Sequence, residues 1–327
     1  MRWLCQTFAI TLAAILQYVG PAAAQEWPTR PVTMVVPFGA GGGVDVLARI
    51  LVPRLGEILR QQVVVENVGG AGGMTGSNRV ARAAPDGYQI GIGVTGTHAQ
   101  NQSLYKRPLY DATVDFAPVG LIADASYILI TKTDFPAANL KEFISYAKAN
   151  QSKMQYGSAG VGSGTHITCL LLNSAIGLEV THVPYRTTAL AMPDLLAGRI
   201  SYLCEPVQTA LPFIQQKTVK PIATLTRDRA AVLPDLQSAH EQGLANFDAA
   251  LWFALFFPKG TPNAIVQRMN GALGEALDSP SVRERLEGIG LRIAARERRS
   301  PDYLAKFVAS EIEKWSGPIK ASGVSID

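Results

Sequence analysis

The chain has 327 residues, of which 47% are hydrophobic and 17% charged, and its formal net charge is +4. These values are typical of an ordinary globular protein, and the length suits two domains. Because the sequence has no basic run and no cluster of aromatic and basic side chains, we expect no nucleic-acid partner.

The first residues have the pattern of a secretory signal peptide. Arg2 supplies a positive charge, residues 8–16 (FAITLAAIL) form a short apolar segment, and Ala22-Ala23-Ala24 is a small-residue cleavage site. A membrane-spanning helix needs about 20 apolar residues, and Gln17 interrupts this segment well before that length. We therefore expect residues 1–24 to be removed after Ala24 and the mature protein to be soluble and exported.

After the signal peptide, short apolar strands alternate with amphipathic helices. The expected strands are residues 32–38, 62–67, 88–94, 118–130, 154–159, 179–185, 199–205, 220–226 and 247–260. The expected helices are residues 44–61, 77–84, 140–150, 165–177, 189–198, 206–215, 264–278, 281–290 and 302–323. Pro53 should kink or restart the first helix, and residues 97–111 look like a loop. The alternation predicts an α/β fold with a mostly parallel sheet.

No flexible linker separates the two halves of the chain, which favours continuous strands that cross from one domain to the other. The candidates are residues 118–130 and 247–258. A chain that crosses twice builds its first domain from both ends. We expect residues 25–123 with 252–327 to form domain 1, residues 124–251 to form domain 2, and the crossing strands to act as a hinge for closure over a ligand.

Two glycine-rich loops, each between a strand and a helix, are the candidate binding elements. They are residues 37–45 (PFGAGGGVD) and residues 157–166 (GSAGVGSGTH). Bare glycine backbone can direct N–H groups inward at a helix start, where the helix dipole favours an anion. A single such loop is commonly just a tightly packed turn, but one in each domain would place two anion sites face to face. Since neither loop contains Lys or Arg, a carboxylate is preferred over a phosphate.

Enzymatic alternatives have little support in the sequence. Residues 91–96 (GIGVTG) match G-x-G-x-x-G, but a dinucleotide fingerprint should open a helix, whereas a loop is expected next. Ser158 and Ser163 each miss the G-x-S-x-G nucleophile motif by one residue. The four histidines show no acid–base spacing, and no Cys or His pair has metal-ligand spacing. We expect no catalytic activity, no cofactor and no metal.

Two cysteines, Cys169 and Cys204, remain after the signal peptide. An exported protein can form a disulfide, but two cysteines at this spacing are not a disulfide framework. The pattern favours two buried small side chains and leaves a disulfide open.

The chain resembles the substrate-binding proteins of tripartite tricarboxylate transporters, also called the Bug or TctC family. The resemblance runs from the signal peptide to the last helix. The matching segments are PFGAGGGVDVLAR (37–49), VVVENVGGAGG (63–73), AAPDGY (83–88), HAQNQSLYKRPLYD (98–111), DFAPVGLI (115–122), YGSAGVGSGTH (156–166), HVPYR (182–186), LPDL (233–236) and GTP (260–262). It implies a type II-like periplasmic binding protein fold with two α/β domains around a ligand cleft.

The resemblance also implies a periplasmic receptor that hands a small carboxylate to membrane permease subunits and acts as a monomer. Family ligands include tricarboxylates, dicarboxylates, acidic amino acids and aromatic acids, and the sequence does not choose among them. The alternatives are a ligand carrier for a two-component sensor and a secreted enzyme on the same fold. The predicted ligand-binding residues are Phe38, Gly39, Ala40, Gly41, Gly42, Gly43, Asp45, Thr97, His98, Ser158, Gly162, Ser163, Thr165, His166, Tyr185 and Glu205.

The sequence departs from the family pattern near the expected pocket. Glu205 stands where the family often has Asp, and it either contacts a ligand amine or water or caps a turn. Arg186-Thr187-Thr188 replaces the usual Lys-Gly after HVPY, and Val68-Gly69 replaces Arg-Pro. The lost glycine changes the loop beside the pocket, so the ligand of a relative cannot be carried over.

Overall fold

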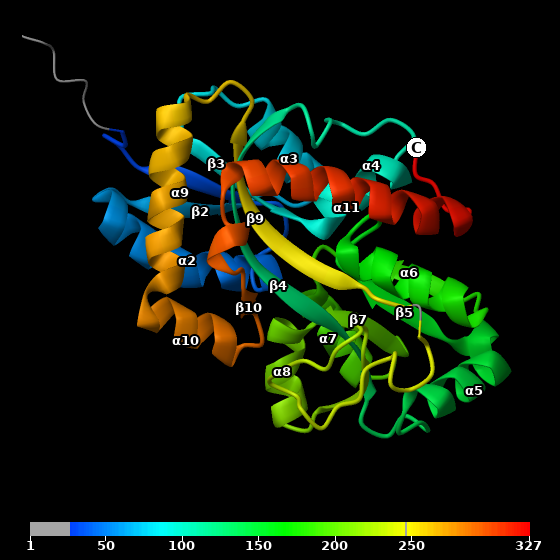
Figure 1. Ribbon diagram of the computed structural model, residues 1–327. Helices are drawn as coiled ribbons and strands as arrows, with labels where there is room; N and C mark the ends of the chain where they lie inside the picture. Colours follow the sequence, from blue (N-terminus) through cyan, green and yellow to red (C-terminus); the bar gives the residue numbers. More distant parts are fainter. Residues whose placement is uncertain (1–26, 246) are drawn as a thin grey trace, which may run out of the picture.

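The structure, a computed structural model, describes residues 27–245 and 247–327 (Figure 1). The expected signal peptide lies outside the described residues. In the part that the structure does describe, no helix combines the length and apolar character needed to cross a bilayer. Each expected strand and helix is present, with ends displaced by a few residues.

The first strands form a parallel group. β1 (Val32–Val36) pairs in parallel with β2 (Val63–Asn67) and β3 (Gln89–Val94). The helices between them are α2 (Gly43–Leu59) and α3 (Met74–Ala81). The apolar stripe of α2 is buried, and this helix continues through Pro53 without the restart that the sequence suggested.

The second parallel group lies further along the chain. β5 (Gln155–Ser158) pairs in parallel with β6 (Thr181–Pro184) and β7 (Tyr202–Pro206). The helices of this part are α5 (Leu140–Asn150), α6 (Gly164–Ile176), α7 (Thr188–Leu196) and α8 (Val207–Gln215). As in the first group, a helix begins directly after each of the three strands or after a short loop.

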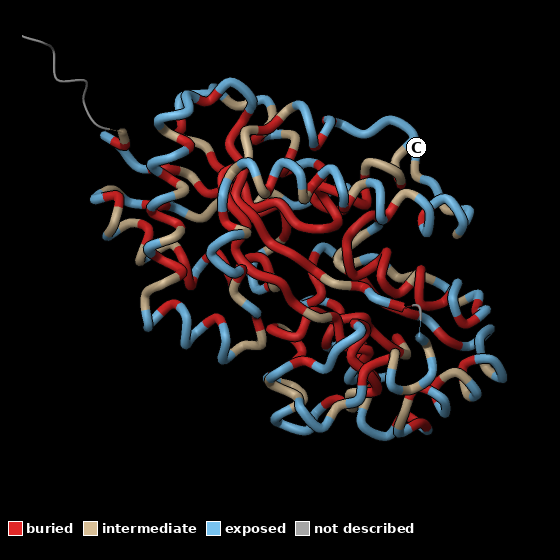
Figure 2. Tube along the Cα trace, in the orientation of Figure 1, coloured by how far each residue is buried: buried red, intermediate tan, exposed pale blue. Residues whose placement is uncertain are grey.

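Two long strands join the groups. β4 (Phe116–Lys132) and β9 (Ala250–Pro258) run antiparallel to each other, and the strand order is β2-β1-β3-β9-β4-β7-β5-β6. β8 (Val219–Thr224) and β10 (Arg292–Ile293) also pair with β4. Figure 1 shows both long strands passing from one group to the other, and Figure 2 shows that they are buried over most of their length.

The expectation of a mostly parallel sheet is wrong, because every described pairing of β4 and β9 is antiparallel. Their partners include β3 and β7, one from each parallel group. A strand buried on both faces has the same apolar pattern in either direction. The sequence therefore predicted these strands but not their orientation.

The last three helices return to the first group. They are α9 (Asn263–Asp278), α10 (Pro280–Gly288) and α11 (Pro301–Ala321). α9 packs against α2, and α11 packs against β4. The indole N–H groups of Trp252 and Trp315 both donate to Glu311, at 3.0 and 3.1 Å. The bond from Trp252 ties α11 to β9, so both ends of the chain build this part of the fold.

Residues 97–111 are not wholly a loop. A π-helical turn covers Gly96–Gln100 and α4 covers Asn101–Leu104. Gly96 to Asn101 are all buried, so this segment has no polar face, and its apolar periodicity could not reveal a helix. G-x-G-x-x-G thus does open a helix, which removes that argument against a dinucleotide site. Its glycines instead permit close packing: a side chain at Gly93 would clash with Phe256.

Cys169 and Cys204 form a disulfide that joins α6 to β7, with their Cα atoms 5.5 Å apart. The favoured interpretation, two separate buried small residues, is therefore wrong. The parallel pairing of β5 with β7 brings α6 over β7. The number of residues between the two cysteines does not reveal that α6 packs against β7.

Candidate functional site

A narrow cavity lies where four helices begin. It contains about 450 Å³ of space between atoms, part of it open to solvent. Its lining residues are Phe38, Gly42, Gly43, Val44, Val94, Tyr127, Ala159, Ser163, Gly164, Thr165, Thr187, Thr188, Pro206, Gln208, Leu251 and Phe253. None of these sixteen side chains is charged. The first N–H groups of a helix have no acceptor within it, and the helix dipole is positive there. The convergence therefore favours an anion.

The first predicted loop supplies the start of α2. Gly42 is its N-cap, with extended backbone angles (φ −76°, ψ 166°). Gly42, Gly43 and Val44 line the cavity together with Phe38, which lies at the beginning of the same loop. Ala40 and Gly41 are exposed, and they lie outside the lining of this cavity.

Asp45 holds this loop in place. Its Oδ2 accepts hydrogen bonds from the Gly41 N–H and from Arg49 Nε, both at 2.9 Å, and its Oδ1 accepts one from Asn67 Nδ2 at 3.0 Å. Burial acts to raise the pKa of Asp45, but these hydrogen bonds outweigh it and hold the pKa below the ordinary value. The ionised carboxylate thus positions the loop through these three hydrogen bonds.

The second predicted loop supplies the start of α6. Ser163 caps the helix, because its Oγ accepts a hydrogen bond from the His166 N–H at 3.3 Å. The Thr165 hydroxyl accepts one from the Ala159 N–H at 2.9 Å. Ser163, Gly164 and Thr165 all line the cavity opposite α2. The two glycine-rich loops therefore meet at one site.

The starts of α7 and α8 complete the cavity, and none of the residues predicted from the sequence lies in them. Thr187 and Thr188 come from the cap and first turn of α7, and Pro206 and Gln208 from the start of α8. Both helices directly follow strands that flank β5. The carboxyl ends of neighbouring parallel strands lie at the same edge of a sheet. The position of α7 and α8 after two such strands could therefore have predicted that they contribute to the site.

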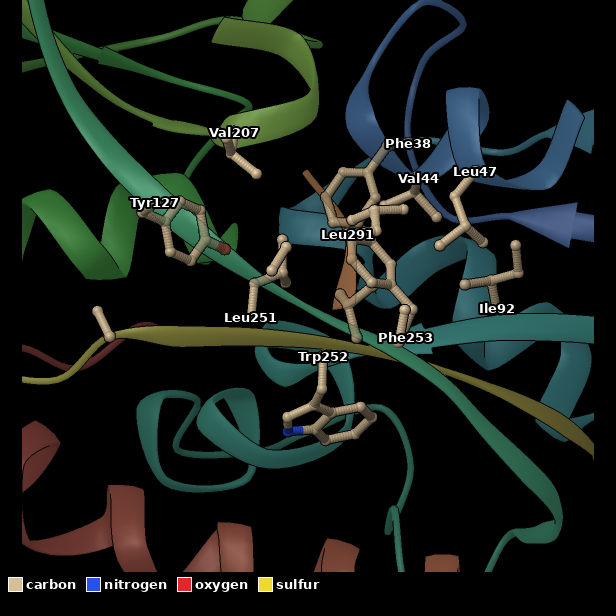
Figure 3. Packing of buried hydrophobic residues seen from close by; sticks show 14 of the residues in the cluster. Phe38, Val44, Leu47, Ile92, Tyr127, Val207, Leu251, Trp252, Phe253 and Leu291 are labelled. Carbon is tan, nitrogen blue, oxygen red and sulfur yellow. The ribbon is translucent and has the colours of Figure 1, made fainter. Parts of the chain in front are cut away.

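The remaining walls are apolar. Phe38 and Val44 belong to the first group of strands and helices, and Leu251 and Phe253 lie on β9 (Figure 3). Tyr127 projects from β4, and its hydroxyl lies against Gly164. Burial, and secondarily the nearby Glu205, raises the pKa of Tyr127, which keeps its hydroxyl neutral.

Several predicted residues lie outside the cavity. Thr97 Oγ1 accepts a hydrogen bond from the Val94 N–H at 3.0 Å, and the His98 ring stacks on Phe256 with 4.1 Å between centroids. Burial lowers the pKa of His98 to about 3, so this ring is a neutral core residue. Thr97 and His98 are thus core residues of the first group rather than lining residues.

Ser158 and His166 also lie behind the cavity wall. Ser158 Oγ is 2.6 Å from Nε2 of His182, a contact that the sequence did not predict. The rings of His166 and His182 lie 4.2 Å apart, and burial lowers their pKa values to about 3 and about 4. Both rings are therefore neutral near pH 7. The serine and the histidines are absent from the cavity lining described above.

Gly39 and Tyr185 line a second, wider opening beside the cavity, together with residues 69–72, 159–161 and 186. The Tyr185 hydroxyl donates to Asp194 at 2.6 Å. Gly162 has a left-handed conformation (φ +79°), and a side chain there would clash with the Tyr105 hydroxyl. Gly39 and Tyr185 therefore line the neighbouring opening rather than the cavity, and Gly162 packs against Tyr105.

Glu205 is buried one layer behind the cavity. Its Oε1 accepts hydrogen bonds from the hydroxyls of Thr188, at 2.7 Å, and Thr209. Its Oε2 has no hydrogen-bond partner among the described residues. Burial raises the pKa of Glu205 to about 7, and the two hydroxyls only partly oppose this effect.

The raised pKa of Glu205 predicts a specific dependence of stability on pH. The folded state holds the proton more tightly than the unfolded state, whose glutamate titrates near its ordinary value of 4.5. The free energy of unfolding should therefore fall as pH rises from about 4.5 to about 7. We expect Glu205→Gln to remove this loss, and to be the more stable protein at pH 8 by up to about 3 kcal/mol.

The measurement is urea unfolding of ligand-free wild-type and Glu205→Gln protein at pH 5 and pH 8. Comparison at each pH cancels the contributions of the buried histidines. An equal difference between the two proteins at both pH values would contradict the assignment of the titration to Glu205.

Residues 47–324 match the model of a known family, the tripartite tricarboxylate transporter family receptor. The chain belongs to this family. Solved structures of similar proteins agree with the receptor fold. MatC from Rhodopseudomonas palustris, solved with bound malate, is 36% identical, with a TM-score of 0.87 over 90% of this chain and 100% of MatC.

Two further solved receptors are similar to the chain. The periplasmic binding protein BugD is 37% identical, with a TM-score of 0.88 over 91% of this chain and 99% of its own. The R. palustris protein Rpa4515, solved with adipate, is 33% identical, with a TM-score of 0.86 over 92% and 99%. The receptor described here thus has the mixed α/β fold of periplasmic binding proteins, as its sequence predicted.

Proposed function

We propose that this receptor binds a small carboxylate in the cavity where α2, α6, α7 and α8 begin, and that it delivers this ligand to membrane permease subunits. The observation that carries the proposal is the convergence of four helix N-termini on a cavity whose sixteen lining side chains carry no charge. Backbone N–H groups and threonine hydroxyls can bind a carboxylate without a cation. The malate and adipate held by similar proteins support a carboxylate ligand.

The proposed binding residues differ in part from those inferred from the sequence. Phe38, Gly42, Gly43, Ser163 and Thr165 remain. The additions are Val44, Gly164, Thr187, Thr188 and Gln208, all of which line the cavity. Asp45 is proposed as a positioning residue, and Thr97, His98, Ser158 and His166 as structural residues behind the wall.

We propose that the ligand is enclosed by closure of two domains, residues 25–123 with 252–327 and residues 124–251, about a hinge in β4 and β9. Three glycines of the first domain closely approach the second domain, which supports this closure. Gly72 approaches the loop at Val161 and Gly162, Gly42 approaches Thr187, and Gly96 approaches Gly164. These glycines let the two halves come together without intervening side chains.

A methyl group at Gly72 should hinder this closure. An added Cβ would lie 2.6 Å from the Val161 carbonyl oxygen, which is backbone and cannot move aside alone. We expect Gly72→Ala to weaken ligand affinity by about 10-fold or more while the protein stays folded. Isothermal titration calorimetry measures the affinity, and circular dichroism monitors the fold.

Gly243→Ala is the matched control, because Gly243 also has a positive φ (+95°) but meets nothing within 4 Å. It should lose a similar small amount of stability to backbone strain and keep full affinity. If Gly72→Ala binds as tightly as Gly243→Ala, the contact does not belong to the closed, ligand-binding state.

The proposed function is tested with protein that has been unfolded to remove bound ligand and then refolded. A panel of aliphatic, aromatic and amino-acid carboxylates is screened by thermal shift. A true ligand at about 100 times its dissociation constant should stabilise the fold by roughly 2.7 kcal/mol. A panel in which no carboxylate raises the melting temperature would refute carboxylate binding.

Export and delivery need separate measurements. We propose cleavage after Ala24, a periplasmic monomer and a membrane permease as the partner. The intact mass of the protein recovered from the periplasm gives the cleavage site, and light scattering gives the oligomeric state. Loss of uptake of the bound acid on deletion of the receptor gene, restored by the wild-type gene, tests the delivery.

A further inference from the structure

We infer that Arg186 is the capture residue of this receptor: it attracts the ligand carboxylate and binds it first, in the wider opening beside the cavity, before the domains close. This inference rests on the proposed function, since it concerns how the same ligand enters the same site. Three features carry it. The opening adjoins the cavity, Arg186 is the only cation among the described residues that line either space, and the charges around it are paired.

The opening adjoins the cavity and is the larger of the two spaces. It contains about 1450 Å³ of space between atoms, part of it open to solvent, whereas the cavity contains about 450 Å³. Ala159 lines both spaces. At Phe38-Gly39 and at Arg186-Thr187, one residue of each pair lines the cavity and the other lines the opening. Since both proposed domains contribute to the opening, a ligand that enters between them passes Arg186 on its way to the helix starts.

The backbone holds Arg186 in place, whereas its side chain is exposed. The next residue, Thr187, is the buried N-cap of α7 and lines the cavity. The Arg186 carbonyl oxygen faces the first glycine-rich loop, where a Cβ on Gly39 would lie 3.6 Å from it. The Arg186 guanidinium forms no ion pair with any acidic side chain that the structure describes. It can therefore meet a ligand from solvent without first breaking a salt bridge.

Three acidic side chains beside the opening each have a basic partner. They either line the opening or form a hydrogen bond with Asn67 or Tyr185, which line it. The pairs are Asp327 with Lys106, Asp45 with Arg49, and Asp194 with Arg199. The two charges of a pair largely cancel at a distance, so Arg186 leaves the opening with a net positive charge. A positive charge in a cleft attracts anions, over about 10 Å at about 0.1 M salt.

Binding would thus proceed in two steps. In the opening the ligand is still hydrated, and Arg186 acts on it through charge. In the closed cavity, whose lining side chains carry no charge, the helix ends hold the carboxylate by hydrogen bonds. A residue that acts only before closure changes the association rate constant and leaves the dissociation rate constant unaltered. The two rate constants therefore distinguish a capture residue from a residue of the final site.

The test is stopped-flow tryptophan fluorescence of ligand-stripped wild-type, Arg186→Gln and Arg186→Glu protein, mixed with malate, adipate, glutamate or benzoate. At about 10 mM salt we expect Arg186→Gln to lower the association rate constant about five-fold for malate and adipate, and Arg186→Glu to lower it about 25-fold. Benzoate has one negative charge and should lose only about two-fold in Arg186→Gln. At about 1 M salt the Debye length is about 3 Å, and all three proteins should associate at similar rates.

Variants of Lys141 are the matched controls. Lys141→Gln and Lys141→Glu make the same changes of net charge at an exposed position on α5, which lines neither space. Both should leave the association rate constant unchanged. Arg186→Lys keeps the positive charge and should associate like the wild-type protein. Dissociation rate constants should agree within about two-fold among all these proteins.

Two results would overturn the inference and leave the proposed function standing. The first is association as fast in Arg186→Glu as in Lys141→Glu. The second is a loss of affinity that appears in the dissociation rate constant alone, which would place Arg186 in the final site. If none of the four acids binds the wild-type protein, the proposed function fails together with the inference.

Discussion

We expect the Gly42→Leu variant to lose ligand affinity by more than about 100-fold while it remains folded. Gly42 caps α2 with φ −76°, a backbone conformation that leucine adopts without strain. A Cβ there would lie 3.0 Å from Thr187 Oγ1, and the rest of the side chain would occupy the cavity that Gly42 lines. The added leucine would thus displace the carboxylate and separate two of the four helix ends.

The measurements are calorimetric titration and urea unfolding of Gly42→Leu, with Gly271→Leu as the control. Gly271 lies in α9, and an added side chain meets nothing within 4 Å, so this control should bind normally. Loss of the glycine cap should lower the stability of Gly42→Leu by only about 1 kcal/mol. Undiminished affinity in Gly42→Leu would exclude the first loop from the binding site.

The second large effect concerns the disulfide. We expect the double variant Cys169→Ala/Cys204→Ala to lose about 3–4 kcal/mol of unfolding free energy, because the cross-link closes a loop with a sequence separation of 35. The bond joins α6 to β7, and the starts of α6 and α8 both line the cavity. The variant should therefore also bind ligand more weakly.

Urea unfolding with and without reductant provides the test. Reductant should lower the midpoint of the wild-type protein toward that of the double variant and leave the double variant unchanged. Two titratable thiols in denatured wild-type protein prepared from the periplasm would show that the bond does not form.

The sequence predicted the fold to a large extent, because apolar periodicity marks elements that are buried on one face or one stripe. α2, with buried Val44, Leu47, Leu51 and Leu55, is such an element. The antiparallel direction of β4 and β9, the helical turn at Gly96–Gln100 and the disulfide all depend on contacts between distant segments. The local sequence pattern does not reveal those contacts between distant segments.

The candidate site was predicted in part for the same reason. Glycine and serine at strand-to-helix junctions revealed the starts of α2 and α6. The starts of α7 and α8 contain threonine, proline and glutamine, which have no distinctive pattern, and only the strand order places them beside the others. His98 was a predicted ligand-binding residue, whereas it stacks on Phe256 inside the core.

The most direct test of the central claim is a structure of the ligand-stripped protein after soaking with the tightest-binding acid of the panel. We expect carboxylate oxygens about 2.7–3.2 Å from the backbone N–H groups at the starts of α2 and α6, at Gly43, Val44, Gly164 or Thr165. A ligand bound instead in the wider opening beside Tyr185 and Arg186, with the helix ends unoccupied, would contradict it.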